Sequence, residues 1–347
     1  MRHEVRATEH RAPIVPADAR TLVEHGIELT VEDSPQRLFA LSNYADAGCT
    51  TKPAGSWVEA SHEHYVIGLK ELPALPAKLT QRHVFFGHAY KGQHGAHKLL
   101  QRFASGGGAL LDLEYLTDAR GRRLAAFGYW AGYVGAALAI LHLRRQLHGP
   151  LRTLSKASLD DALTRTRGRD EPRVLVVGAR GRSGRGARAA LAAAGISPTC
   201  WGIAETDPLD RRMLLDHDVL VNAVSTPHPV TPFLTPADVA DRARRLAVVA
   251  DVTCDVRSDY NVLPIYDSTT DWQQPVRRLR DREPLLDIIA IDNLPSLLPR
   301  EASVDFSAQL LPQLLTLGSA APAWRRCLRA FDDACAEAEV RTQRAAE

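Results

Sequence analysis

Two titratable side chains stand at the ends of apolar segments in the first third of the sequence. Lys70 closes the segment YVIGLK at 65–70, and His88 lies in FFGHAYK at 85–91. The chain has six lysines against 37 arginines, so a lysine in an apolar setting stands out. Because lysine and histidine can both exchange protons near neutral pH, this pair predicts acid–base catalysis. A solvated lysine and a structural histidine are the alternative interpretation.

Cationic side chains near apolar neighbours in the same part of the chain predict an acidic substrate. They are Arg11, Lys91, Arg122 and Arg123. Carboxylates are bound by charge-assisted hydrogen bonds from such groups. We therefore expect a substrate that carries a carboxylate.

A glycine-rich turn follows the apolar run VLVVG at 174–178. Gly178, Gly181 and Gly184 have the spacing GxxGxxG, and an alanine-rich helical segment comes next. Glycines between a strand and a helix let the backbone approach a pyrophosphate at the helix N-terminus. The turn predicts a dinucleotide site, and an ordinary glycine-rich strand-to-helix turn is the alternative.

The second strand of this predicted domain lacks the acid that a dinucleotide-binding fold uses for the ribose 2′-hydroxyl. Gly202 stands where we expect that acid, in the segment PTCWGIAETD at 198–207. Two interpretations stay open. Either Glu205 or Asp207 reaches the ribose, or the site accepts a 2′-phosphate, for which nearby arginines offer cations. These arginines are Arg180, Arg182 and Arg185.

The elements that must position these residues follow from the apolar pattern. Short runs at 27–33, 65–70, 83–91 and 109–116, flanked by Gly and Pro, predict strands of a mixed α/β domain. The segment 127–149 predicts a long buried helix that ends at Gly149 and Pro150. Continuous apolar runs at 174–178, 219–225, 246–253 and 288–292 predict a doubly wound parallel sheet. The tail at 322–343 predicts an amphipathic helix that packs back on the first domain.

Composition narrows the class of protein. The chain has 347 residues, a net charge of +2 and 45% hydrophobic residues, which together predict about two globular domains. A nearly balanced charge argues against a nucleic-acid partner, and no apolar run reaches the ~18 residues of a membrane span. The five cysteines are scattered and never spaced as CxxC, so we expect neither a metal site nor a disulfide. The first residues lack the apolar stretch of a secretory signal, so we expect a cytoplasmic location.

Several long strings resemble lysine-forming saccharopine dehydrogenase, a family related to alanine dehydrogenase. They are VEDSPQ (31–36), PAGSW (53–57), GLKELP (68–73), HAYK (88–91), DLEYL (112–116), GRRLAAFGYWAGYVGAAL (121–138) and IDNLPSLLPREAS (291–303). The resemblance implies an α/β fold of two Rossmann-like domains, each with a parallel sheet, and an active site in the cleft between them. It places a substrate and catalytic domain at 1–127 plus 300–347, and a dinucleotide-binding Rossmann domain at 128–299.

The resemblance also implies the reaction and its residues. The family reversibly converts saccharopine, NAD and water into L-lysine, 2-oxoglutarate and NADH. Lys70 matches the family's catalytic base, and His88 matches its proton donor. Expected substrate contacts are Arg11, Lys91, Arg123 and Phe127. Expected cofactor contacts, from the turn and the resemblance together, are Arg122, Gly178, Gly181, Arg182, Gly184, Thr206, Ser225, Val252, Ile291, Asp292, Asn293 and Leu294.

Two departures from the family pattern leave alternatives open. A family lysine before Arg11 has no counterpart, which leaves the exact amine and 2-oxo acid open. The family's acid on the second strand corresponds to Gly202, so we expect NAD as cofactor with NADP as the alternative. A reductive coupling of another amine with a 2-oxo acid, or a non-catalytic ligand-binding relative, are the alternative functions. The expected partners are small amino-acid and 2-oxo-acid substrates, with no nucleic acid and no membrane; the oligomeric state stays open.

Overall fold

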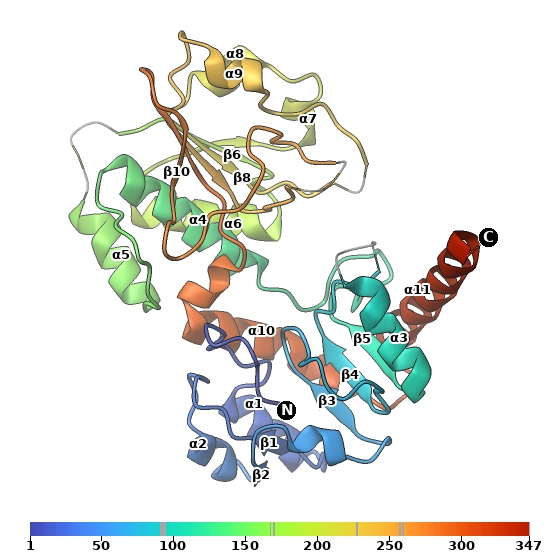
Figure 1. The fold of residues 1–347 in the computed structure, drawn as a ribbon. Coiled ribbons are helices and arrows are strands. Elements are labelled where there is room, and N and C mark those ends of the chain that lie inside the picture. The colour runs from blue at the N-terminus through green and yellow to red at the C-terminus, as the bar shows by residue number, and fades with distance from the viewer. Residues whose placement is uncertain are drawn as a thin grey trace. The chain divides into compact units, whose positions relative to one another are not determined.

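The computed structural model describes residues 1–90, 95–166, 168, 171–226, 228–256, 258 and 260–346. The chain forms two compact units (Figure 1). The first unit comprises Met1–Ala126 and Ala302–Glu347, and the second comprises Phe127–Glu301. The first unit therefore contains both ends of the chain.

A three-stranded parallel sheet forms the centre of the first unit. Its strands are β3 (Tyr65–Ile67), β4 (Arg82–Phe85) and β5 (Ala109–Asp112), in that order. Helices α3 (Ala96–Gly106) and α11 (Pro322–Ala346) pack beside β5 (Figure 1). Their apolar faces bury Phe103 and Phe331 in one cluster with Trp57 and Phe85. The tail is therefore the amphipathic helix that its sequence predicts, and it covers the core of the first unit.

The N-terminal segment is tied into the same unit by smaller elements. Helix α1 (Pro16–Glu24) precedes β1 (Thr30–Glu32), and α2 (Leu41–Ala45) connects β1 to its parallel partner β2 (Thr50–Lys52). The short helix η1 (Ser56–Glu59) follows. In α10 (Pro299–Leu314), the hydroxyls of Ser303 and Ser307 accept hydrogen bonds from the backbone N–H groups of Ala12 and Val15. These bonds fix the chain that leads from residue 1 to α1.

The second unit is a doubly wound sheet in the order β10-β11-β9-β8-β6-β7. The parallel strands are β6 (Val174–Val177), β7 (Thr199–Trp201), β8 (Val219–Asn222), β9 (Val248–Asp251) and β11 (Leu286–Ile289), and β10 (Arg277–Arg280) is an antiparallel edge strand. The strands β6, β8, β9 and β11 are buried along their whole length, as expected for strands of a sheet that is covered on both faces. The predicted α/β class with parallel sheets is confirmed.

Helices lie on both faces of this sheet (Figure 1). On one face are α4 (Gly128–Leu143) and α6 (Arg182–Ala193), with α5 (Lys156–Arg165) beside them. On the other are α8 (Arg211–Leu215) and α9 (Pro236–Ala240), and the remaining short helices are α7 (Ile203–Thr206) and η2 (Leu294–Leu297). The chain reverses its winding between β6 and β8. In such sheets ligands bind at the carboxyl ends of the strands, at this point of reversal.

Helix α4 ends earlier than its sequence predicts. We expected a helix over 127–149, but α4 stops at Leu143. Arg145 adopts a left-handed conformation with φ of 58°, and Gln146 and Arg145 donate backbone hydrogen bonds to Leu141 and His142. This is a Schellman ending in which arginine takes the place usually held by glycine. The expected stop at Gly149 was therefore wrong.

No helix among the described residues is long and apolar enough to cross a membrane. Within the same residues, no group of three or more His, Cys, Asp or Glu side chains lies close enough together to hold a metal ion. No disulfide joins any of the five cysteines, all of which lie among the described residues.

Candidate active site

The carboxyl ends of the parallel strands in the first unit carry the titratable residues of interest. Lys70 follows β3, His88 follows β4, and Asp112 ends β5, with Glu114 two residues further on. Because neighbouring parallel strands end on the same edge, the sheet brings these four residues to one edge. Residues that are up to 44 positions apart in the chain thus lie along one edge of the sheet.

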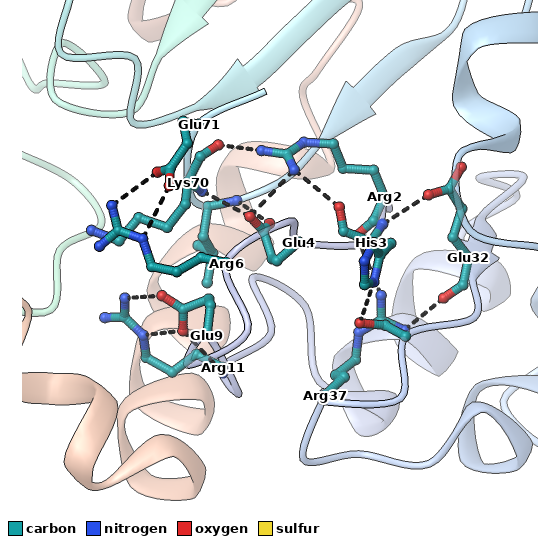
Figure 2. A network of polar contacts seen from close by, with 12 residues as sticks. Arg2, His3, Glu4, Arg6, Glu9, Arg11, Glu32, Arg37, Lys70 and Glu71 are labelled. Atoms are coloured by element: carbon teal, nitrogen blue, oxygen red, sulfur yellow. Dashed lines mark hydrogen bonds and ion pairs between the residues drawn. The ribbon is translucent and has the colours of Figure 1, made fainter. Parts of the chain in front are cut away.

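The backbone of Lys70 is held on both sides by two N-terminal residues (Figure 2). The Glu4 carboxylate accepts hydrogen bonds from the N–H groups of Leu69 and Lys70, at 2.7 and 3.0 Å. The Arg2 guanidinium donates to the Lys70 carbonyl and pairs with Glu4 at 3.3 Å. Arg2 and Glu4 are only 2% and 5% exposed. We call this pair the Arg2–Glu4 clamp; it fixes the main chain from which the half-buried Lys70 side chain extends.

Gly68 makes room for this clamp. A Cβ atom at Gly68 would lie 2.4 Å from Nε of Arg2, far inside a normal contact. The same guanidinium lies 5.7 Å from the centroid of the Phe85 ring, where a cation is attracted to the π face. The glycine of the GLKE string therefore has a packing reason.

Two further ion pairs flank this segment (Figure 2). Arg11 donates from Nε and Nη2 to both oxygens of Glu9, at 2.8 and 2.6 Å, and both residues are buried. Burial opposes the charge of Glu9, but Arg11 and then Lys70 hold the pKa of Glu9 below its ordinary value. Arg6 and Glu71 form a second two-bond pair at 3.0 and 3.1 Å on the exposed side. The positive charge of Lys70 is therefore close enough to act on the Glu9–Arg11 pair.

His88 lies in an exposed, acid-lined position. Its side chain is 52% exposed, its backbone is left-handed with φ of 49°, and its ring stacks on Phe86 at 6.4 Å. Nδ1 of His88 lies 3.8 Å from one oxygen of Glu114, and Nη1 of Arg123 lies 4.0 Å from the other. The Glu114 carboxylate thus joins the expected proton donor to an expected substrate contact.

Asp112 and Glu114 are the residues of this edge to which the sequence analysis gave no role. Asp112 is fully buried and accepts backbone hydrogen bonds from Gly87 and Glu114, at 3.2 and 2.9 Å. Burial, with a smaller contribution from the charge of Glu114, raises the pKa of Asp112 to about 7. The apolar run at 109–116 could have identified both acids, because its strand ends beside the strand that precedes His88.

The other expected contacts on the first part of the chain are placed as follows. Arg122 is 72% exposed and makes a two-bond pair with Asp118 at 2.8 Å. Phe127 is the residue before the first turn of α4 and belongs to the second unit. Lys91 lies outside the described residues.

The glycine turn of the second unit has the close contacts that a phosphate-binding turn requires. Gly178 follows β6 with φ of 81°, and Gly181 immediately precedes α6. A Cβ atom at Gly184 would lie 2.2 Å from the Gly178 carbonyl, so only glycine lets α6 begin this near the strand. The N-terminus of α6 has no side-chain cap, and the N-terminal end of a helix favours an anion. Arg182 is the first residue of α6.

Glu205 of α7 places its carboxylate beside the end of β7. The Glu205 carboxylate accepts a hydrogen bond from the N–H of Gly202 at 2.6 Å. A Cβ atom at Gly202 would lie 3.4 Å from that carboxylate and 4.0 Å from Cζ of Arg180. Asp207 is exposed, and Thr206 donates its hydroxyl hydrogen bond to the Gly202 carbonyl at 3.1 Å. Glu205, rather than Asp207, therefore lies where the second-strand acid was expected.

The remaining expected cofactor contacts follow the carboxyl ends of neighbouring strands of the same sheet. Ser225 comes after β8 and is exposed, and Val252 comes directly after β9. The segment at 291–294 follows β11, with Asp292 exposed and Asn293 left-handed at φ of 70°. A Cβ atom at Gly135 of α4 would meet both Val252 and Leu294, so these two side chains pack on α4. Ile291 is buried.

Comparison with known proteins places the chain among named relatives. It is 40% identical to saccharopine dehydrogenase [NAD(+), L-lysine-forming] of Neurospora crassa, over 96% of this chain and 95% of the relative. It is 37% identical to the protein of the same name from Yarrowia lipolytica, over 96% of both chains. Residues 1–134 match the family described as alanine dehydrogenase/PNT, N-terminal domain.

Solved structures share the fold. L-alanine dehydrogenase superposes with a TM-score of 0.67 at 17% identity, covering 96% of this chain and 94% of that one. A transhydrogenase from Sinorhizobium meliloti superposes with a TM-score of 0.62 at 13% identity, covering 91% and 92%. The expectation of two Rossmann-like domains is confirmed by this likeness.

Proposed function

We propose that this chain, which belongs to the family of the NAD-dependent, lysine-forming saccharopine dehydrogenases, interconverts saccharopine, NAD and water with L-lysine, 2-oxoglutarate and NADH. The observation that carries the proposal is the 40% identity over 96% of the chain with the Neurospora relative. The strand ends of the first unit support it, because they bring a lysine, a histidine and two acids to one edge.

Lys70 is proposed as the general base. Oxidation of a secondary amine requires a deprotonated nitrogen, because its lone pair must push the hydride out of the neighbouring C–H bond. The Arg2–Glu4 clamp holds the main chain of Lys70, which limits the positions that its Nζ atom can reach. In its neutral form Nζ takes the proton from the substrate amine.

His88 is proposed to move protons when water adds to the oxidised carbon–nitrogen bond and the product breaks into amine and 2-oxo acid. The Glu114 oxygen at 3.8 Å stabilises a positively charged imidazolium, which is the form that gives a proton away. With more than half of its side chain exposed, His88 can exchange its proton with solvent between turnovers.

Arginine side chains are proposed to hold the substrate carboxylates. Arg123 is half-exposed, and its Nη1 atom lies 4.0 Å from a Glu114 oxygen. The Arg11 side chain is buried, and its Nε and Nη2 atoms donate hydrogen bonds to Glu9. Arg11 therefore offers a cation of fixed orientation. Lys91 and Phe127 stay proposed substrate contacts on the resemblance alone.

The residues of the second unit fit a dinucleotide. The glycine cradle and the uncapped start of α6 provide the surroundings for a pyrophosphate, and the point of winding reversal lies between β6 and β8. NAD, when bound, accepts the hydride. We propose that Gly178, Gly181, Arg182 and Gly184 hold its phosphates. The other proposed contacts are Arg122, Thr206, Ser225, Val252, Ile291, Asp292, Asn293 and Leu294.

Glu205 is proposed to hold the ribose diol in place of the missing second-strand acid. Its carboxylate lies beside the Gly202 N–H, where it can accept hydrogen bonds from the ribose and repel a 2′-phosphate. This favours NAD over NADP.

The cytoplasmic location and the small-molecule partners expected from the sequence stay proposals as well.

The test is the change in NADH absorbance when the purified protein is mixed with L-lysine and 2-oxoglutarate. We expect NADH to be consumed with this pair and not when alanine or ornithine replaces lysine. Consumption with another amine alone would replace the substrate and keep the reaction class. No consumption with any amine, by a protein that still binds NADH, would overturn the proposal in favour of a ligand-binding relative.

A further inference from the structure

The first unit contains a cavity of about 500 Å³ that neither Lys70 nor His88 lines. Residues from the first 67 positions line it, together with two leucines at the end of α10 and just beyond. Arg2 of the clamp is part of its wall. The volume lies within the range of sites that bind small organic molecules. The proposed function does not use this cavity.

The floor of the cavity is apolar. Eight apolar residues of its lining are buried in the core, among them Leu22, Leu29, Trp57, Val66, Ile67 and Leu314. Binding is favourable when the apolar body of a ligand displaces water from such a floor, because apolar surface is then buried.

The rim of the cavity is acidic. Glu28, Glu59 and Glu63 line it and are exposed, and no described residue forms an ion pair or a hydrogen bond with the carboxylate of any of the three. Lys52 is the one exposed lysine or arginine in the described lining. A fourth acid, Glu32, is already occupied, because its carboxylate accepts hydrogen bonds from His3, Ser56 and Trp57. The rim is therefore negative, although the chain as a whole carries a charge of +2.

We propose that this cavity is a second ligand site, which binds a small organic cation with an aliphatic or aromatic body. The apolar body fills the floor, and the ammonium group lies among the three rim carboxylates. A neutral molecule of the same shape gains only the apolar contacts. A carboxylate is repelled by the rim, which gives the site its selectivity for charge.

Isothermal titration calorimetry with hexylamine, hexanol and hexanoate tests this proposal without requiring turnover. We expect hexylamine to bind at one site, about fivefold more tightly than hexanol, and hexanoate to bind least. The advantage of hexylamine should shrink in high salt, because exposed charges are screened. Equal affinity for hexylamine and hexanol would overturn the proposal.

Variants locate the binding. Glu59→Gln with Glu63→Gln should weaken hexylamine binding about threefold or more and leave hexanol unchanged. Asp332→Asn with Asp333→Asn removes two exposed acids of α11 instead, and should leave hexylamine binding unchanged. Unchanged binding in the Glu59/Glu63 variant would overturn the proposal.

Binding must also be separated from the proposed active site, since hexylamine resembles the side chain of lysine. Hexylamine binding should persist at saturating 2-oxoglutarate and NADH, and should persist in Lys70→Met. Trp57 emission should respond to hexylamine and lose that response in Trp57→Phe. Complete displacement by the substrates would show that the amine occupies the active site and would refute a second site. These outcomes do not depend on whether the proposed reaction occurs.

Discussion

Lys70 extends its long side chain from a main chain that is hydrogen-bonded at both the N–H and the carbonyl. Its N–H and its carbonyl are both engaged by the buried Arg2–Glu4 clamp, and Arg2 is seated on Gly68. A general base gains from this arrangement, because the flexible lysine stem needs a fixed origin to place Nζ reproducibly.

Replacing Lys70 with methionine tests its role as base. Methionine keeps the length and apolar stem of lysine and removes the ammonium, so we expect turnover to fall by about 10²-fold or more while NADH binding stays unchanged. Steady-state rates and NADH fluorescence titration measure the two effects. Lys78→Met is the control, because Lys78 is an exposed lysine of the same unit. Near-normal turnover in Lys70→Met would remove this lysine from the mechanism.

We expect Glu205 to select the cofactor at its ribose. In Glu205→Ala the carboxylate beside Gly202 is lost while Arg180 stays, so the preference for NAD over NADP should shrink by about tenfold or more. Rates with both cofactors, compared with an Asp207→Ala control, measure it. A shift in the Asp207 variant instead would assign the ribose to Asp207.

At the scale of elements, β4 buries a histidine that has no polar partner. His83 is fully buried, its ring meets Trp57 and Phe103 at 5.1 and 5.4 Å between centroids, and neither ring nitrogen has a hydrogen-bond partner. Burial, with Arg2 and Arg102 adding to it, lowers the pKa of His83 to about 3. The unfolded chain takes up this proton near its ordinary pKa of about 6.5, whereas the folded chain does not.

The stability of the protein should therefore fall as the pH drops from about 6.5 toward 3. The unfolded state binds more protons in this window, so the free energy of unfolding loses about 1.4 kcal/mol per pH unit from this residue. Urea unfolding at neutral and acid pH should show a flatter profile for His83→Leu than for the wild type. His64→Leu, an exposed histidine of the same unit, should leave the profile unchanged. A wild-type slope retained in His83→Leu would contradict this account.

Helices α4 and α6 touch through their backbones, and glycines make this contact. A Cβ atom at Gly186 would lie 1.8 Å from the Tyr129 carbonyl, and one at Gly132 would lie 1.8 Å from the Ser183 carbonyl. Gly186→Ala should therefore destabilise the protein by about 3 kcal/mol, because two helix backbones must separate. Thermal and urea unfolding measure this loss.

Gly181→Ala is the matched change at the start of α6. Gly181 has an ordinary φ of −68°, and its Cβ atom would meet only the Gly178 carbonyl, at 3.3 Å. The free energy of unfolding of the Gly181→Ala variant should change little. Its affinity for NADH should fall, because the added methyl group lies in the turn proposed to hold the pyrophosphate. Equal stability of the two alanine variants would contradict the close-packing argument.

At the scale of the whole molecule, the two compact units divide the proposed work. Lys70, His88 and the acids beside them belong to the first unit, and the glycine turn with the ends of β6 to β11 belongs to the second. Hydrogen exchange with and without NADH tests this division. We expect NADH to slow exchange at 178–186, 222–226 and 251–254, since a ligand protects the backbone that it contacts. The strands β3 to β5 are the internal comparison, and protection confined to them would place the cofactor in the first unit.

The sequence by itself determined the elements that depend on local pattern. The apolar runs of the second sheet, the glycine turn before α6 and the amphipathic tail were all predicted, because periodicity and turn chemistry act over a few residues. The end of α4 was not predicted, because arginine rarely adopts the left-handed conformation that Arg145 has there.

Only the tertiary structure decided which distant groups meet. The Glu4 carboxylate accepts a hydrogen bond from the N–H of Lys70, 66 positions away. The Arg2 guanidinium packs against Gly68. Asp112 and Glu114 lie near His88 because β5, which ends at Asp112, is hydrogen-bonded to β4. Glu205 reaches back to Gly202 because a helix begins immediately after β7. Such contacts depend on strand order and packing, which no single stretch of sequence encodes.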